Sequence, residues 1–274
     1  MTTTSARKAA PRLKKSLGQH FLHNDRIARR IVAAADLRPG DAVLEIGPGG
    51  GALTRHLVAA AGRVTVVELD ARVLEGLRAA FGDRVGIIHA DILKTDLSAL
   101  ADRLGVGRWR VIGNLPYYIT TPILFHLLDH RDRVQDAVIM MQREVAARLV
   151  APPGTKDYGI LTVECSLLAD LDVLFAVQPG AFVPPPTVVS SMVRVRMLPE
   201  PRFPVADEAH FRRLVRGTFG KRRKTLRNTL KMFLDAEPPA MPAGIDLSRR
   251  PEELSLEEFV RLSNALLNDR RDAQ

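Results

Sequence analysis

Cysteine and long apolar runs are nearly absent from this 274-residue chain. The single cysteine, Cys165, excludes an internal disulfide and a cysteine-based metal site, so we expect a buried apolar thiol and no bound metal. No uncharged apolar run approaches the ~18–20 residues of a membrane helix, and the basic start leads into no secretory signal. We therefore expect a cytoplasmic protein with no membrane association. The 46% hydrophobic and 26% charged composition excludes wholesale disorder.

Positive charge is concentrated in two parts of the chain. Residues 1–40 carry nine basic and two acidic side chains, and residues 202–232 carry ten and two. Because the total charge is +9, the rest of the chain is net acidic. Within residues 219–228, cations alternate with apolar residues at helical spacing, which predicts a helix with Phe219, Leu226 and Leu230 inside. Such a helix would present cations to the phosphates of a polyanion, and salt-sensitive RNA binding is the expected consequence.

Short β-branched runs alternate with helical segments over the first two thirds of the chain. The runs predicted as buried parallel strands are residues 42–46, 64–68, 85–89, 110–113 and 137–141. Helices are predicted from an Asn24 or Asp25 cap to about Ala35, and over residues 52–61 and 71–81. This order predicts an α/β fold with a doubly wound, Rossmann-like sheet and ligands at the carboxyl ends of its strands.

Further along, residues 187–197 alternate as a strand with one more solvated face. Prolines at 199, 201 and 204 form a linker, after which the pattern is helical. We therefore predict three parts: a mobile basic tail over residues 1–14, an α/β domain over 15–200, and a smaller, mostly helical domain over 201–274.

A glycine-rich turn and two acidic residues follow successive predicted strands. The turn reads EIGPGGG at residues 45–51, where Gly47 and Gly49 allow a close approach of the backbone to a ligand. Glu68 ends the second strand, where a carboxylate accepts hydrogen bonds from ribose hydroxyls, and Asp91 follows the third. The pattern favours a nucleoside-bearing cofactor. A nicotinamide dinucleotide, and thus an oxidoreductase, is the competing interpretation. Its fingerprint, G-x-G-x-x-G, has glycine at the sixth position, where this chain has Ala52.

The fourth predicted strand ends in the run GNLPY at residues 113–117. An adenine N6 amine is a poor nucleophile because its lone pair is delocalised into the ring. Acceptors for its protons, the Asn114 side-chain oxygen and the Leu115 carbonyl in a turn stiffened by Pro116, would favour a tetrahedral nitrogen. Tyr117 offers a flat face on which an extruded base can stack. We therefore predict positioning chemistry on an adenine, with no general base.

With these motifs the chain resembles the ribosomal RNA small-subunit adenine N6,N6-dimethyltransferase family, the kasugamycin-resistance methyltransferase type. The resemblance covers roughly residues 14–268. It rests on residues 17–22 (LGQHFL), 45–51, Glu68, Asp91, 114–117, 181–186 (AFVPPP) and 219–228.

The resemblance implies a class I methyltransferase domain that uses S-adenosylmethionine, and assigns roles to particular residues. The cofactor would be held by His20, Leu22, Gly47, Gly49, Glu68, Asp91 and Asn114. The catalytic set would be Asn114, Leu115, Pro116, Tyr117 and Phe182, with Phe182 and Tyr117 sandwiching the base. RNA would be bound through the helical domain by Lys221, Arg222, Arg223, Lys224 and Arg227.

The implied reaction is dimethylation of N6 of two adjacent adenosines in the 3′-terminal hairpin loop of 16S rRNA, as part of ribosome biogenesis. The implied partner is a pre-30S particle, and nothing in the sequence requires more than a monomer. Two alternatives remain open at this point. One is a 23S rRNA adenine N6-methyltransferase that confers macrolide resistance; the other is a non-catalytic RNA-binding assembly factor of the same fold.

Overall fold

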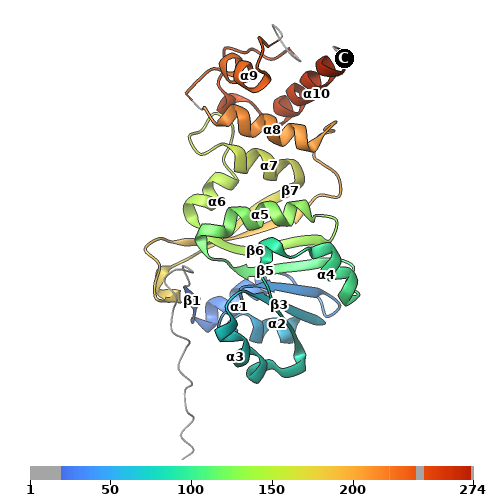
Figure 1. Cartoon of the computed structure of the whole chain (residues 1–274). Helices are drawn as coiled ribbons and strands as arrows, with labels where there is room; N and C mark the ends of the chain where they lie inside the picture. Colours follow the sequence, from blue (N-terminus) through green and yellow to red (C-terminus); the bar gives the residue numbers. More distant parts are fainter. Residues whose placement is uncertain (1–19, 222, 239–243, 273–274) are drawn as a thin grey trace, which may run out of the picture. The chain divides into compact units, whose positions relative to one another are not determined.

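The computed structural model describes residues 20–221, 223–238 and 244–272, with side chains described up to residue 267 (Figure 1). The predicted tail over residues 1–14 lies outside these ranges. Packing divides the chain into two compact units. The first comprises the described part of Met1–Arg143 together with Leu174–Arg194, and the second comprises Glu144–Val173 together with the described part of Val195–Gln274.

Within the described residues, seven strands form one sheet in the order β4-β3-β2-β5-β6-β9-β7. Their bounds are β2 Ala42–Ile46, β3 Arg63–Glu68, β4 Val85–His89, β5 Trp109–Asn114, β6 Val134–Gln142, β7 Ala169–Val177 and β9 Ser190–Met197. The strands from β2 to β6 pair in parallel. Ile46 lies opposite both Val67 and Gly113, so the carboxyl ends of β3, β2 and β5 meet at one edge. The predicted α/β, Rossmann-like fold is confirmed.

Helices connect these strands. Those of the first unit are α1 Asp25–Ala34, α2 Thr54–Ala60, α3 Ala71–Phe81, α4 Leu97–Leu104 and α5 Thr120–Asp129, with short 3-10 turns η2 Gly82–Arg84, η3 Ile92–Lys94, η4 Tyr117–Ile119 and η5 Pro179–Ala181. The predicted cap of α1 is confirmed, because the Asn24 side chain accepts a hydrogen bond from the Ile27 amide at 3.1 Å. Asp70 caps α3 in the same way through the Arg72 amide.

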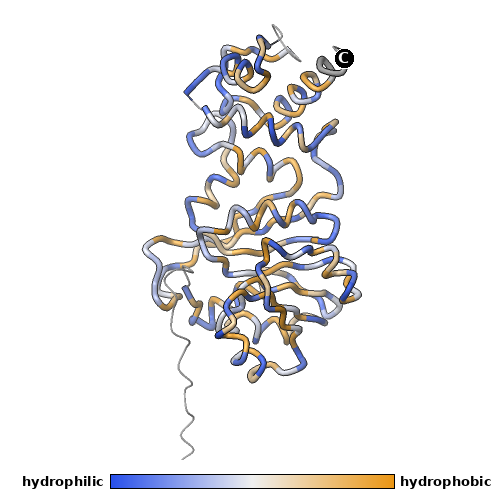
Figure 2. The backbone as a smooth tube through the Cα atoms, in the orientation of Figure 1, coloured by the Kyte–Doolittle hydropathy of each residue, from blue (hydrophilic) through white to orange (hydrophobic). Residues whose placement is uncertain are grey.

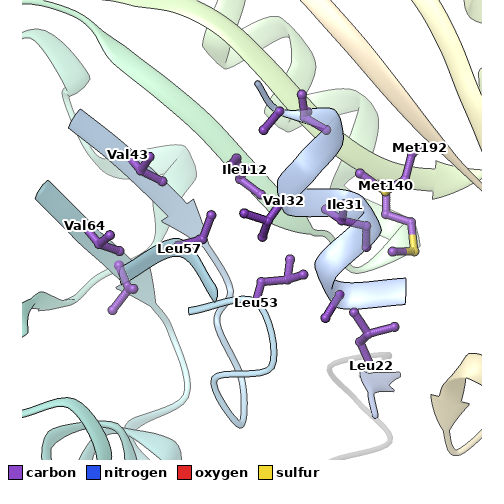
Figure 3. Packing of buried hydrophobic residues seen from close by; sticks show 14 of the residues in the cluster. Leu22, Ile31, Val32, Val43, Leu53, Leu57, Val64, Ile112, Met140 and Met192 are labelled. Atoms are coloured by element: carbon purple, nitrogen blue, oxygen red, sulfur yellow. The ribbon is translucent and has the colours of Figure 1, made fainter. Parts of the chain in front are cut away.

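The core of the first unit lies where α1 and α2 pack on the sheet. Ile31 and Val32 of α1 belong to one buried cluster with Leu57 of α2 and with Val43 and Ile112 of the strands (Figure 3). The hydropathy colouring shows the matching pattern, with apolar residues running through the strands and alternating with polar ones along the helices (Figure 2). Burying each such aliphatic side chain contributes about 1.5–3 kcal/mol, so this packing fixes the strands that carry the site.

A separate two-stranded sheet forms from distant parts of the sequence. Strand β1 (Phe21–Leu22) pairs antiparallel with β8 (Phe182–Val183). The amides of His23 and Asn24 add hydrogen bonds to the Ala181 carbonyl at 3.0 and 3.4 Å. These bonds hold the chain before α1 against the segment that precedes β9.

The second unit is mostly helical and also contains parts of strands β7 and β9. Its helices are α6 Arg143–Leu149, α7 Ile160–Leu168, α8 Glu208–Phe219, α9 Leu226–Leu234 and α10 Leu256–Asp272, with the 3-10 turn η7 Pro251–Glu253. The Phe219 ring stacks on Phe259 at a centroid distance of 5.6 Å. The Arg216 side chain bonds both carboxylate oxygens of buried Glu164, at 2.7 and 2.9 Å. This pairing of α8 with α7 explains why residues 144–173 pack with the carboxyl-terminal unit, whereas the sequence pattern placed the boundary near residue 200.

Two further expectations differ from the structure. The strand expected to have a more solvated face, β9, begins with four buried residues, because it lies between β6 and β7 in the sheet.

The helix expected over residues 219–228 is interrupted: α8 ends at Phe219, and Thr225 is extended before α9 begins. The first amides of α9 bond the Arg249 and Leu247 carbonyls, which satisfies this new helix start. The predicted burial of Phe219, Leu226 and Leu230 is confirmed.

Cys165 is fully buried, as predicted, and burial raises the pKa of its thiol. Among the helices that the structure describes, none is both long and apolar enough to cross a membrane.

Candidate functional site

One cavity of the first unit collects most of the residues predicted to act. It has a volume of about 720 Å³, which is in the range of small-molecule sites. Its walls come from the carboxyl ends of β2, β3 and β5 and from the segment around β1. The predicted residues that line it are His20, Leu22, Gly47, Gly49, Glu68, Asn114, Leu115, Pro116 and Tyr117.

The glycine turn brings bare backbone to this cavity. Gly47 and Gly49 have φ values of +66° and +52°, which glycine adopts without a steric penalty. A Cβ atom at Gly47 would meet no atom within 4 Å, so its backbone faces open space, whereas one at Gly49 would lie 2.8 Å from the Phe21 ring. The turn therefore permits a ligand to approach the main chain closely on one side while β1 covers the other.

Glu68 is the acidic side chain at the end of β3. It is buried, with 6% of its surface exposed. Its Oε2 accepts a hydrogen bond from the Gly49 amide at 3.2 Å, and its Oε1 accepts one from the Asp70 amide at 2.8 Å. Burial raises the pKa of Glu68, while these amide hydrogen bonds act in the opposite direction. Each oxygen retains a further lone pair for a ligand hydroxyl.

Asn114 and Tyr117 stand at the end of β5. The Asn114 amide nitrogen donates to the His20 carbonyl at 3.0 Å. Within the described ranges no group donates to its Oδ1, which leaves that oxygen free to accept. Hydroxyl oxygens of Tyr117 and buried Ser190 lie 2.6 Å apart, and burial raises the pKa of Tyr117. The Ile119 amide bonds the Pro116 carbonyl at 3.1 Å and shapes the turn between these residues.

The remaining predicted residues of the first unit lie elsewhere. Asp91 follows β4, and its side chain caps η3 through the Leu93 amide at 3.0 Å, outside the residues that line the cavity. Phe182 is only 2% exposed and belongs to the core, whereas its neighbour Val183 is 54% exposed and lines the cavity. Because successive strand residues face opposite sides, the phase of β8 turns Val183 rather than Phe182 toward the cavity. The structure therefore places the Phe182 ring outside the cavity lining, and its expected role beside the target base stays a prediction.

The predicted RNA-binding cations belong to the second unit. Lys221, Arg223, Lys224 and Arg227 are exposed, and Arg222 lies outside the described residues. One acidic side chain, Glu237, lies 2.8 Å from Lys231 Nζ and 3.7 Å from Arg227 Nη1. The exposed cations around the start of α9 form a positive surface of the kind that phosphate groups bind.

The sequence interpretation missed three residues at or beside the cavity. Val183 lines it, Ser190 holds the Tyr117 hydroxyl, and Leu69 directly follows Glu68 with 51% of its surface exposed. Leu69 stands between the acidic residues Glu68 and Asp70 at the end of the predicted strand, and this pattern could have drawn attention to it. Among the described residues, no group of His, Cys, Asp and Glu side chains is arranged to hold a metal ion.

Glu45, which also lines the cavity, predicts a pH dependence of stability. It is 1% exposed, accepts a hydrogen bond from the Thr54 hydroxyl at 2.6 Å, and burial raises its pKa from 4.5 to about 8. Between pH 4.5 and 8 the folded protein keeps the Glu45 proton, whereas the unfolded chain loses it. The contribution of the protonated carboxyl to the unfolding free energy is therefore complete below pH 4.5 and is lost as the pH rises through 8.

Glu45 should therefore lower the unfolding free energy of the wild type by about 1.4 kcal/mol for each pH unit within that window. Glu45→Gln has no proton to lose there, so its unfolding free energy should lack this decline. Urea denaturation of the wild type and the variant at pH 5.5, 6.5 and 7.5 measures the difference between them. Parallel pH profiles for the two proteins would contradict this assignment.

Comparisons with known proteins give close relatives along nearly the whole chain. The "Ribosomal RNA small subunit methyltransferase A" of Geobacter metallireducens is 47% identical over 264 residues, which cover 93% of this chain and 96% of the relative. The protein of the same name from Pseudomonas aeruginosa is 44% identical over 257 residues, covering 93% and 95%.

Solved structures agree with the fold. A dimethyladenosine transferase from Plasmodium falciparum superposes with a TM-score of 0.75 at 25% identity, covering 93% of this chain and 98% of its own. The 23S rRNA methyltransferase ErmE gives a TM-score of 0.68 at 28% identity, covering 90% and 99%. The model of the family "Ribosomal RNA adenine dimethylase" matches residues 10–268, so the chain belongs to the ribosomal RNA adenine dimethylase family.

Proposed function

We propose that this protein transfers methyl groups from S-adenosylmethionine to N6 of two adjacent adenosines in the 3′-terminal hairpin loop of 16S rRNA. The observation that carries this proposal is that Glu68, Asn114 and Tyr117 line the same cavity. Relatives named for the small ribosomal subunit share 44–47% of their residues with this chain, against 28% for the 23S rRNA enzyme. These identities favour the small-subunit substrate.

The cavity fits the cofactor by size and by its polar groups. Its volume of about 720 Å³ accommodates a nucleoside with an amino-acid tail. The Glu68 oxygens would accept hydrogen bonds from the two ribose hydroxyls, and the open backbone at Gly47 would lie beneath the ligand. Leu69 and Asp91 lie outside the cavity lining, where β3 and β4 end side by side. There the exposed Leu69 side chain would contact the face of the adenine, and Asp91 would accept a hydrogen bond from its amine. When bound, S-adenosylmethionine supplies a sulfonium methyl group.

The residues at the end of β5 would prepare the target nitrogen. The Oδ1 of Asn114, to which no described residue donates, would accept one amine proton, and the Leu115 carbonyl would accept the second. These hydrogen bonds favour a tetrahedral nitrogen whose lone pair is directed away from the ring. Tyr117 holds the base by stacking, and Ser190 fixes the orientation of that ring. Rate enhancement would come from orientation, because the methylated nitrogen becomes acidic enough to lose its proton unaided.

The proposed substrate is a pre-30S particle, bound by a monomer. Transfer of tritiated methyl groups to undermethylated 30S particles and to 50S precursors tests the proposal. Label in the small subunit is expected, at two adjacent adenosines. Label only in the large subunit would favour the 23S alternative, and no label in either would favour a non-catalytic assembly factor.

The exposed cations of the second unit predict a salt-dependent affinity. Reversing two of them, with Arg223→Glu and Lys224→Glu together, should weaken particle binding at least tenfold at about 0.1 M salt, because two phosphate contacts are lost. The slope of log affinity against log salt concentration should fall by about 1.4–1.8. Filter binding across a salt series measures both quantities.

The matched control reverses two exposed cations of the first unit, with Arg78→Glu and Arg103→Glu. It makes the same change in total charge and is expected to leave the slope unchanged. Equal effects of the two double variants would mean that net charge, rather than this surface, sets the affinity.

A further inference from the structure

The His20 ring stacks against the Tyr117 ring inside the cavity. The two ring centroids lie 5.6 Å apart with an angle of 29° between the planes, and both residues line the cavity. Nδ1 of His20 donates a hydrogen bond to the Pro184 carbonyl at 2.8 Å, which holds the imidazole in place. An aromatic side chain therefore already stacks against Tyr117, the ring on which the target base is proposed to stack.

The geometry leaves no room for a base between these two rings. Aromatic rings in contact have planes ~3.5 Å apart, so an inserted base would require about 7 Å between His20 and Tyr117. Each ring makes one hydrogen bond besides their shared stacking contact, but the two hydrogen bonds differ in exposure. The Tyr117 hydroxyl bonds fully buried Ser190, whereas the hydrogen bond from the His20 imidazole to Pro184 is exposed, so the imidazole is the ring that solvent can release.

The backbone of His20 is fixed independently of its side chain. Its carbonyl accepts the hydrogen bond from Asn114, and the next two residues pair with Phe182 and Val183 in the β1–β8 sheet. Rotation about the side-chain bonds of His20 is thus sufficient to clear the Tyr117 face, without unpairing β1.

We propose that the His20 imidazole occupies the base subsite in the RNA-free protein and is displaced when the target adenine enters. This inference rests on the proposed function. His20 then competes with the base: the apparent affinity for substrate is reduced by the fraction of molecules in which the imidazole covers Tyr117. Removing the ring should make substrate binding tighter, a direction opposite to the loss of an ordinary contact residue.

Steady-state methyl transfer to undermethylated 30S particles tests the proposal. His20→Ala is expected to lower KM for the particle about three- to tenfold when measured at saturating S-adenosylmethionine, so that a change in cofactor affinity at this residue does not enter the comparison. His20→Phe restores a stacked ring and should return KM to within twofold of the wild type. If the alanine variant does not fold, His20→Asn serves instead, because it lacks the ring but keeps a side-chain donor for Pro184.

His23→Ala is the matched control. Nε2 of His23 bonds the Gly180 carbonyl at 3.2 Å, so this variant loses a similar hydrogen bond to the same segment without changing the Tyr117 face. Its KM should stay within twofold of the wild type. An increased KM in His20→Ala would mean that the ring is a wall of the subsite, and an unchanged KM would mean that it does not compete; either result overturns the inference. Absence of transfer by the wild type would instead count against the proposed function.

Discussion

Replacing Asn114 by alanine is expected to lower kcat for methyl transfer about 10²–10³-fold. The variant removes the Oδ1 acceptor to which no described residue donates, and with it the group proposed to align the target amine. It also removes the hydrogen bond to the His20 carbonyl, a loss of about 0.5–1.5 kcal/mol in unfolding free energy. Single-turnover transfer of labelled methyl groups to undermethylated 30S particles measures the first effect, and thermal denaturation measures the second.

Two other variants separate catalysis from structure. Asn114→Asp keeps an acceptor oxygen, so it should retain more transfer than alanine. Asn264→Ala removes two hydrogen bonds of another asparagine, to the Ala206 amide and the Pro204 carbonyl, and should leave kcat within twofold. If Asn114→Ala binds the particle normally and keeps more than a tenth of the wild-type kcat, the amide does not carry the proposed role.

Local patterns were sufficient to predict the central strands and their connecting helices. Runs such as residues 42–46 and 85–89 are short, apolar and β-branched, and they form strands with the predicted bounds. Strand β7 (Ala169–Val177) was missed because Asp170 and Asp172 interrupt its apolar pattern, and most of its residues are only partly buried. The two-residue strands β1 and β8 are too short for any periodicity, since their pairing depends on residues about 160 positions apart.

The same distinction holds for the candidate site. Glu68 and Asn114 could be placed together because the ends of parallel strands share an edge of the sheet. The contacts that shape the base subsite, from Ser190 and His20 to Tyr117, join residues far apart in sequence and follow from tertiary packing. The orientation of Phe182 could not be predicted either, because one residue of register decides which of two neighbours faces the cavity.

Replacing Glu68 by alanine is the second change expected to have a large effect, this time on cofactor affinity. Two charge-assisted hydrogen bonds to ribose hydroxyls, at about 1.5–3 kcal/mol each, correspond to a loss of roughly 10²–10⁴-fold. The variant also frees the Gly49 amide, so the glycine turn loses an anchor. Isothermal titration with S-adenosylhomocysteine measures the affinity. Glu75→Ala, which removes an exposed carboxylate from α3, serves as the control and should bind normally.

Glu68→Gln distinguishes the charge from the shape of this side chain. The glutamine retains one acceptor oxygen, so its affinity should fall between those of the wild type and the alanine variant. Burial raises the pKa of Glu68, so the wild-type carboxylate gains a proton at a higher pH than an ordinary glutamate as the solution is acidified. A protonated carboxyl loses acceptor capacity, and wild-type affinity should therefore decline with falling pH while that of Glu68→Gln stays flat. If the two pH profiles run parallel, or if the alanine variant binds as tightly as the wild type, Glu68 does not hold the ribose.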